Sequence, residues 1–209
     1  MIDLRQQIND VRRTLGDRTL EAGQARVLTI SQVYDTDIDD LWQVVTRPER
    51  IARWFLPVTG ELKEGGSYSL QGNASGTITK CDKPRGYDAT WEFGGMVSWI
   101  EVRLRPEGGG TRFELQHIAH VDDNMWDQYG PGATGVGWEL GFMGLAMHLA
   151  DPVASPDPAS MQTWHETPEG REFIRAAADR WAGAAIEYGD DPEKAKASGD
   201  RTYGFYTGT

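Results

Sequence analysis

The stretch from Gly130 to Ala150 constrains the fold more than any other part of the chain. It is the longest apolar-rich run with a helical period, because large apolar residues recur at spacings of three and four. One side carries Trp138, Phe142, Leu145 and Leu149, and the other carries Leu140, Met143 and Met147. A helix that is apolar on two sides needs two covers, so the run predicts a buried core helix. Its interior Gly, Glu and His residues argue against insertion into a membrane.

The composition limits the partners that the chain can have. Its 209 residues carry a formal net charge of -11, whereas nucleic acids and anionic membrane surfaces favour clustered Lys and Arg. We therefore expect no nucleic-acid partner. The single cysteine, Cys81, excludes an intramolecular disulfide framework and a cysteine-rich metal site. Charges interrupt every short apolar group near the N-terminus, so no signal peptide is expected, and we predict a cytoplasmic protein.

The N-terminal part of the chain predicts short helices around one strand. Residues 2 to 15 have loosely helical spacing, and Ala25 to Tyr34 is β-branched and alternating, as in a strand. Thr36 resembles the N-cap of a helix that continues through Val45. A further short helix is expected to begin at Pro48 and to end before Pro57.

The segment from Gly60 to His120 predicts a set of antiparallel strands. Five short runs are separated by Gly, Pro, Asp or Asn, and the connections are too short for parallel crossovers. Alternation places Tyr87, Ala89, Trp91 and Phe93 on one face of their strand. The sheet should therefore have one apolar face, which the helix at Gly130 to Ala150 would cover.

The C-terminal part predicts a linker and one more helix. Asp151 to Glu166 is rich in Pro, Ser and Asp and is typical of a linker. Thr167 and Pro168 predict the start of a helix that continues to about Tyr188. Its apolar face would cover the back of the core helix, and the aromatic residues of the last segment would hold the tail in place. The predicted organisation is an N-terminal helical arm (1–24), a main domain (25–150) and a C-terminal linker and helical extension (151–209).

This order of elements resembles the helix-grip fold of the START-like superfamily. Short motifs in the sequence are similar to those of bacterial proteins related to the C-terminal domain of the activator of heat-shock-protein-90 ATPase. These motifs are Trp42, Thr46 to Glu49, Trp54 to Phe55, Trp91 to Phe93, Gly110 to Arg112, Leu115 to His117 and Gly137 to Glu139. The resemblance implies an α+β fold in which a curved antiparallel sheet wraps around a long C-terminal helix. It also implies an apolar cavity, which across the superfamily holds lipids, polyketides or other hydrophobic ligands.

The predicted ligand cavity lies between the sheet and the core helix. Large aromatic rings with a few polar tips make suitable cavity walls. The candidate cavity residues are Trp42, Trp54, Phe55, Trp91, Phe93, Phe113, Leu115, His117, Trp138, Phe142 and Leu145.

The histidines give little support for catalysis or metal binding. His117 and His120 would point to opposite faces of one strand, which is poor geometry for chelation, so we predict no metal and no other cofactor. His117 is a weak catalytic candidate that would need a carboxylate or hydroxyl partner.

Three functions stay open, because this fold hosts several. We favour a carrier or sensor of a small hydrophobic molecule. The alternatives are a cyclase-like or hydrolytic enzyme that uses the same cavity, and a co-chaperone-like module that binds a protein partner through an exposed apolar patch. The sequence also leaves a homodimer open.

Overall fold

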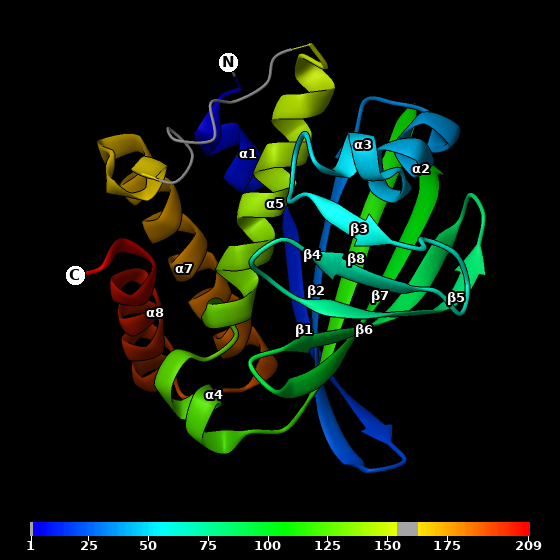
Figure 1. Cartoon of the computed structure of the whole chain (residues 1–209). Helices are drawn as coiled ribbons and strands as arrows, with labels where there is room; N and C mark the ends of the chain where they lie inside the picture. Colours follow the sequence, from blue (N-terminus) through cyan, green and yellow to red (C-terminus); the bar gives the residue numbers. More distant parts are fainter. Residues whose placement is uncertain (1, 154–162) are drawn as a thin grey trace.

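An eight-stranded antiparallel sheet forms the centre of the molecule (Figure 1). The computed structural model describes residues 2–153 and 163–209. The strands are β1 (Arg12–Leu20), β2 (Gly23–Tyr34), β3 (Val58–Gly60), β4 (Ser67–Leu70), β5 (Ser75–Asp82), β6 (Gly86–Phe93), β7 (Met96–Glu107) and β8 (Gly110–His120). Their order across the sheet is β1-β2-β8-β7-β6-β5-β4-β3. Every neighbouring pair is antiparallel, as the short connections predicted.

The helices pack mainly against one face of this curved sheet (Figure 1). They are α1 (Leu4–Asp10), α2 (Ile38–Thr46), α3 (Pro48–Ile51), α4 (Asp123–Tyr129), α5 (Gly132–Ala150), the short 3-10 helix η1 (Trp164–Glu166), α7 (Pro168–Tyr188) and α8 (Pro192–Thr207). The predicted α+β fold, with a curved antiparallel sheet, a long core helix and a C-terminal helical extension, is confirmed. None of the described helices has both the length and the apolar character needed to cross a membrane.

The two faces of the sheet differ in polarity, as the alternation of the strands predicted. Ile100, Val102 and Leu104 of β7 are buried in the main core. The neighbouring outward positions carry charge, and Glu101 pairs with Arg18 of β1. The exception is Phe93, which was predicted to face inward but is 53% exposed. It is the last residue of β6, immediately before the turn at Gly94.

The core helix α5 is covered on more than one side. Phe142 and Leu145 are almost completely buried in the same cluster as the inward residues of the sheet. On another side α5 packs along α7, whose Trp181 is fully buried. Helix α7 begins and ends where the sequence predicted, with the Thr167 hydroxyl accepting a hydrogen bond from the Gly170 N–H. The predicted linker before it lies partly outside the described residues.

The helix predicted at the N-terminus is only half as long as expected. The helix predicted for residues 2 to 15 ends at Asp10, and Arg12–Leu20 is the edge strand β1. Pairing with β2 along nine positions gives this segment regular backbone partners. The inward guanidinium of Arg13 also forms a buried ion pair with Glu139 of α5. Neither the strand pairing nor the ion pair can be predicted from the spacing of the apolar residues alone.

Other helix boundaries also differ from the prediction. Asp37, rather than Thr36, caps α2 and accepts from the Asp40 N–H. The second short helix ends at Ile51 instead of near Leu56. Two helices were not predicted: Asp122 caps α4, and Asp191 caps α8 with Pro192 in the first turn. Both caps are local signals, but each helix is short or has few large apolar residues.

Candidate ligand-binding cavity

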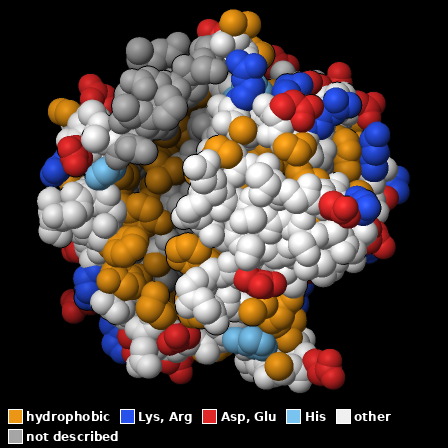
Figure 2. All heavy atoms as spheres, viewed as in Figure 1, with side chains coloured by type: hydrophobic (Ala, Val, Ile, Leu, Met, Phe, Trp, Pro, Cys, Tyr) orange, Lys and Arg blue, Asp and Glu red, His pale blue; other side chains and the backbone are white. Residues whose placement is uncertain are grey.

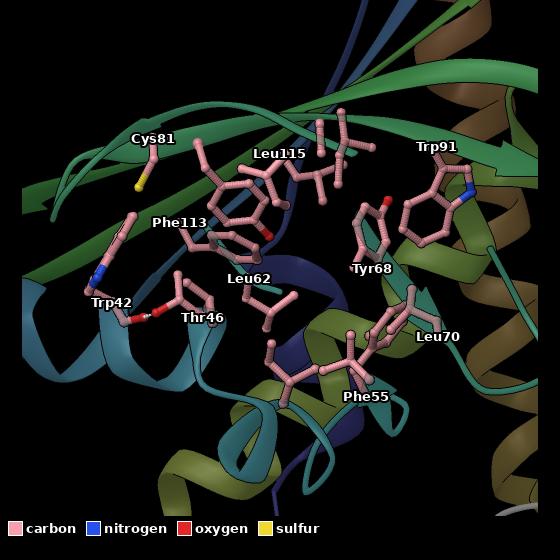
Figure 3. A pocket seen from close by; sticks show the side chains of 18 of the residues that line it. Trp42, Thr46, Phe55, Leu62, Tyr68, Leu70, Cys81, Trp91, Phe113 and Leu115 are labelled. Carbon is pink, nitrogen blue, oxygen red and sulfur yellow. Dashed lines mark hydrogen bonds between the residues drawn. The ribbon is translucent and has the colours of Figure 1, made fainter. Parts of the chain in front are cut away.

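An apolar cavity of about 340 Å³ lies between the inner face of the sheet, the α2–α3 segment and α5 (Figure 3). This volume is within the range of small-molecule sites, roughly 300–1,000 Å³. The lining residues are Trp42, Val45, Thr46, Ile51, Trp54, Phe55, Val58, Leu62, Lys63, Glu64, Tyr68, Leu70, Ile78, Cys81, Lys83, Tyr87, Ala89, Trp91, Ile100, Phe113, Leu115, Trp138, Gly141 and Phe142.

A chain of aromatic rings forms one wall. Trp54 lies just after α3 and is fixed by its indole N–H, which donates to the Val44 carbonyl at 3.1 Å. Its ring contacts Phe55 at a centroid distance of 5.5 Å, and Phe55 stacks on Trp138 of α5 at 5.9 Å. Trp138 in turn lies 4.9 Å from Trp91 of β6. The rings hold each other in place without filling the space beside them.

A second set of rings holds α5 against the sheet. Phe142 stacks on Phe113 of β8 at 4.9 Å. The Tyr34 hydroxyl donates to the carbonyl of Phe142 at 3.1 Å, which fixes the helix to β2. Both phenylalanines line the cavity, so the same contacts that hold α5 also form part of the cavity wall.

Few polar groups face the interior. The Tyr68 hydroxyl donates to the Thr90 carbonyl at 2.7 Å, and the Thr46 hydroxyl donates to the Trp42 carbonyl at 2.6 Å. The hydroxyl of Tyr87 has no hydrogen-bond partner among the described residues. Burial raises the pKa of Tyr87 to about 12, so this phenol is neutral and can donate to a bound molecule.

Charged residues lie at one end of the cavity. Lys63 and Glu64 lie in the loop between β3 and β4. Lys83 lies in the turn between β5 and β6, next to Cys81 near the end of β5. Figure 3 shows Cys81 and Trp42 at this end, with Trp91 at the far end. We call the end formed by Trp42, Lys63, Glu64, Cys81 and Lys83 the mouth.

His117 lies behind the aromatic wall and does not line the cavity. Its Nδ1 accepts a hydrogen bond from the indole N–H of Trp138 at 3.1 Å, which leaves the proton of the neutral ring on Nε2. Burial lowers the pKa of His117 to about 4, so the ring is neutral near pH 7. The partner that we required for catalysis was a carboxylate or a hydroxyl, and the observed partner is an indole. His117 therefore orients Trp138.

The other histidine of this strand faces away from the cavity. His120 contacts Trp99 edge-on, with ring centroids 5.4 Å apart. Within residues 2–153 and 163–209, no group of three or more His, Cys, Asp or Glu side chains is arranged to hold a metal ion.

The structure brings most of the candidate residues together. Eight of them line the cavity: Trp42, Trp54, Phe55, Trp91, Phe113, Leu115, Trp138 and Phe142. Three do not. Phe93 is exposed at a hairpin tip, Leu145 is fully buried in the core, and His117 lies behind Trp138.

The lining residues of the short strands were not predicted from the sequence. Tyr68 and Leu70 come from β4, which has four residues, and Ile78 comes from β5. The alternation of Tyr68 and Leu70 with Ser67 and Ser69 was the available signal, but it covers too few positions to identify a buried face. The polar mouth gave no signal, because its residues belong to three separate segments.

These elements and the space between sheet and core helix define a START-like, helix-grip protein. Residues 35–150 match the family model described as Activator of Hsp90 ATPase homolog 1-like protein, and the chain belongs to this family. A comparison with curated proteins finds no match.

Two solved structures of CalU16 from Micromonospora echinospora are similar to this chain. The crystal structure is 36% identical with a TM-score of 0.63, and the match covers 84% of this chain and 98% of CalU16. The solution structure is 37% identical with a TM-score of 0.69, covering 86% and 97%. These matches are longer than the family segment, so the likeness includes parts of the flanking elements.

A more distant structure is similar in fold alone. Protein MLL2253 from Mesorhizobium loti is 16% identical, with a TM-score of 0.53, and the match covers 62% of this chain and 99% of that protein.

Proposed function

We propose that this protein binds a small hydrophobic molecule in the cavity and acts as a carrier or sensor. The observation that carries this proposal is the cavity of about 340 Å³, which is lined almost entirely by apolar side chains and opens at the mouth. Apolar surface in such a cavity is exposed to water until a ligand covers it, and its removal from water is favourable. A ligand of matching size would restore the missing contacts and stabilise the folded state.

The polar groups favour binding over chemistry. Tyr68 and Thr46 both donate to backbone carbonyls, so they hold the walls together. His117 would have to lose its bond with Trp138 before Nδ1 could act as a base. Among the described lining residues, Tyr87 is the one whose hydroxyl has no hydrogen-bond partner, which suits the orientation of a ligand better than acid–base catalysis at neutral pH.

A tryptophan-fluorescence titration tests the proposal, because Trp42, Trp54, Trp91 and Trp138 line the cavity. The ligands are dodecanoic acid, its methyl ester and a planar flavonoid, and native mass spectrometry reports any molecule that is retained on purification. Ala89 is buried on the cavity wall, so Ala89→Leu should fill part of the space and weaken binding by about tenfold, the effect of roughly 1.4 kcal/mol.

Thr79→Leu is the matched control, because Thr79 is exposed on the neighbouring strand and does not line the cavity. It should leave the affinity unchanged. A complete lack of binding across the ligand panel, or equal binding by both variants, would contradict the proposal.

A partner-binding module is the second candidate. Phe93, Met96 and Val97 are all more than half exposed around the β6–β7 turn. Figure 2 also shows hydrophobic side chains along a hollow over α5 and α7. If the protein binds a partner through the exposed residues of the β6–β7 turn, replacing Phe93 and Met96 by Ser should abolish that association and leave ligand titrations unchanged. Loss of ligand binding in Ala89→Leu, with normal association with the partner, would instead support the cavity as the functional site.

A further inference from the structure

We infer that the ligand of this cavity carries a single carboxylate, which lies at the mouth against the ammonium group of Lys83. This inference rests on the proposed function and adds the chemical class and the orientation of the ligand. The hydrophobic body of the molecule would extend from Trp42 at the mouth toward Trp91 at the far end (Figure 3).

The first observation is the charge balance at the mouth. Lys63 forms an ion pair with Glu61 at 2.9 Å, and the Glu64 carboxylate accepts the backbone N–H of Cys81 at 2.9 Å. No carboxylate pairs with Lys83 anywhere in the described part of the chain. Among the cavity-lining residues that the structure describes, Lys83 is therefore the cation without an ion-pair partner, and Glu64, held by a backbone N–H, is the anion without one.

The nearby acidic side chain does not neutralise it. Asp82 precedes Lys83 in the turn between β5 and β6, but its carboxylate forms a bidentate pair with Arg85, with distances of 2.6 and 2.9 Å. Both oxygens are thus used by a neighbouring guanidinium. Lys83 is left free to bind an anion that enters beside it.

The second observation is the contrast with the rest of the molecule. The chain has 32 acidic and 21 basic residues, so its overall field disfavours anions. The lining is less acidic than the chain as a whole, since it carries two lysines and one glutamate, and Lys63 is paired with Glu61 outside the lining. Because the unpaired ammonium group of Lys83 lies at the mouth, an anionic group has a free cation to bind there and at no other point of the described lining.

The third observation is the absence of charge along the rest of the lining, where residues such as Leu70, Ile78 and Leu115 are apolar. An ion moved to that depth would lose its hydration without gaining a partner. A lysine on a flexible stem at the edge can instead follow a carboxylate that stays partly hydrated. These conditions select an amphipathic molecule with one anionic end.

The test compares dodecanoic acid with its uncharged methyl ester at neutral pH and low salt. The unmodified protein should bind the acid more tightly than the ester by roughly three- to tenfold, the range expected for a partly exposed ion pair next to an apolar surface. Lys83→Gln should remove this preference and keep the affinity for the ester. Raising the salt concentration should reduce the preference in the unmodified protein.

Lys80→Gln is the matched control. Lys80 lies on β5 close to the same turn and carries the same charge, but it does not line the cavity. It should keep the preference for the acid. If Lys80→Gln removes the preference as fully as Lys83→Gln, a general field rather than a site at Lys83 is responsible, and the inference is wrong.

The remaining outcomes separate the inference from the proposed function. Equal binding of acid and ester by the unmodified protein overturns the carboxylate and leaves the hydrophobic cavity in place. Binding of neither compound, with no other ligand in the panel, overturns the proposed function itself. Dodecyl phosphate distinguishes the two common anionic heads, and tighter binding of the phosphate than of the acid would reject the carboxylate.

Discussion

The two sides of helix α5 show how one apolar segment can serve two purposes. Toward α7 the packing is so close that a Cβ atom on Gly135 would lie 2.4 Å from the ring of Trp181. Toward the α2–α3 segment, a Cβ atom on Gly141 would meet the ring of Phe55 at 3.4 Å, which is close to an ordinary contact. The first side is filled by the C-terminal helices, whereas the second faces the cavity.

The two sides also differ in whether their polar groups have partners. On the packed side, Glu139 is fully buried and pairs with Arg13 of the edge strand β1. On the cavity side, Tyr87 has a hydroxyl that is free to bind a ligand. We infer that the packed side provides stability and that the cavity side provides binding. Substitutions on the two sides should therefore have separable effects.

The largest effect is expected for Arg13→Met on the packed side. Without Arg13 the carboxylate of Glu139 stays buried and unpaired, and the loss of one partner of such a pair costs about 3–5 kcal/mol. The free energy of unfolding at pH 7, measured with urea, should fall by this amount. The double variant Arg13→Met/Glu139→Leu should recover most of it, since apolar side chains can replace a buried pair.

The pH dependence of Arg13→Met adds a second readout. Burial already raises the pKa of Glu139, and Arg13 opposes that shift. Removing Arg13 should raise the pKa further. The unfolded chain then loses the proton first, so the stability of the variant relative to the unmodified protein should decline as the pH rises through the carboxylate range. A deficit that is the same at pH 5 and pH 8 would show that the carboxylate is not its cause.

The next largest effect separates two glycines of the same helix. Gly135→Ala should destabilise the protein by about 1–3 kcal/mol, because the new methyl group overlaps the Trp181 ring. Gly141→Ala should be neutral or stabilising by up to about 1 kcal/mol, since alanine favours the helix. Thermal unfolding of both variants checks the contrast. Equal losses of stability would mean that the two sides of α5 are packed alike.

A smaller effect should come from His117. Its pKa is lowered from 6.5 to about 4, so the unfolded chain takes up a proton on this side chain before the folded protein does. The stability should therefore fall as the pH decreases from 6.5 to about 4, and His117 should contribute about 1–2 kcal/mol of this loss after allowance for partial solvation. His117→Gln keeps an acceptor for Trp138 but cannot titrate.

The informative quantity is the difference between the two pH profiles, because His148 and the carboxylates titrate in both proteins. The stability gap between His117→Gln and the unmodified protein should change in favour of the variant as the pH decreases over this interval. Parallel profiles would show that the protonation of His117 is not linked to folding.

Sequence periodicity predicted the framework well and the cavity only in part. The capped start of α7 and the antiparallel strands follow from local rules, and the alternation of Tyr87, Ala89 and Trp91 identified an inward face. The strand β1 was missed because its partner contacts, including Arg13 with Glu139, join residues that are far apart in the sequence. Lys83 was missed for the same reason, since the residues that line the cavity beside it come from separate segments of the chain. Local patterns identify buried faces but do not show where the packing leaves space.

The smallest expected effect distinguishes two tyrosines of the cavity wall. The Tyr68 hydroxyl donates to the Thr90 carbonyl, so Tyr68→Phe should lower the free energy of unfolding by about 0.5–1.5 kcal/mol. Tyr87→Phe removes a hydroxyl that has no partner among the described residues, and should leave the stability unchanged within about 0.5 kcal/mol.

Ligand affinity should show the reverse order for these two tyrosines. Tyr68→Phe keeps the ring and the shape of the wall, so it should bind as tightly as the unmodified protein. Tyr87→Phe should bind a ligand with a polar group several-fold more weakly, because one hydrogen bond contributes about 0.5–1.5 kcal/mol. Urea unfolding and fluorescence titration of the same two variants measure both quantities. If Tyr87→Phe alters stability but not binding, its hydroxyl holds the wall as that of Tyr68 does, and the cavity has no free polar anchor at that position.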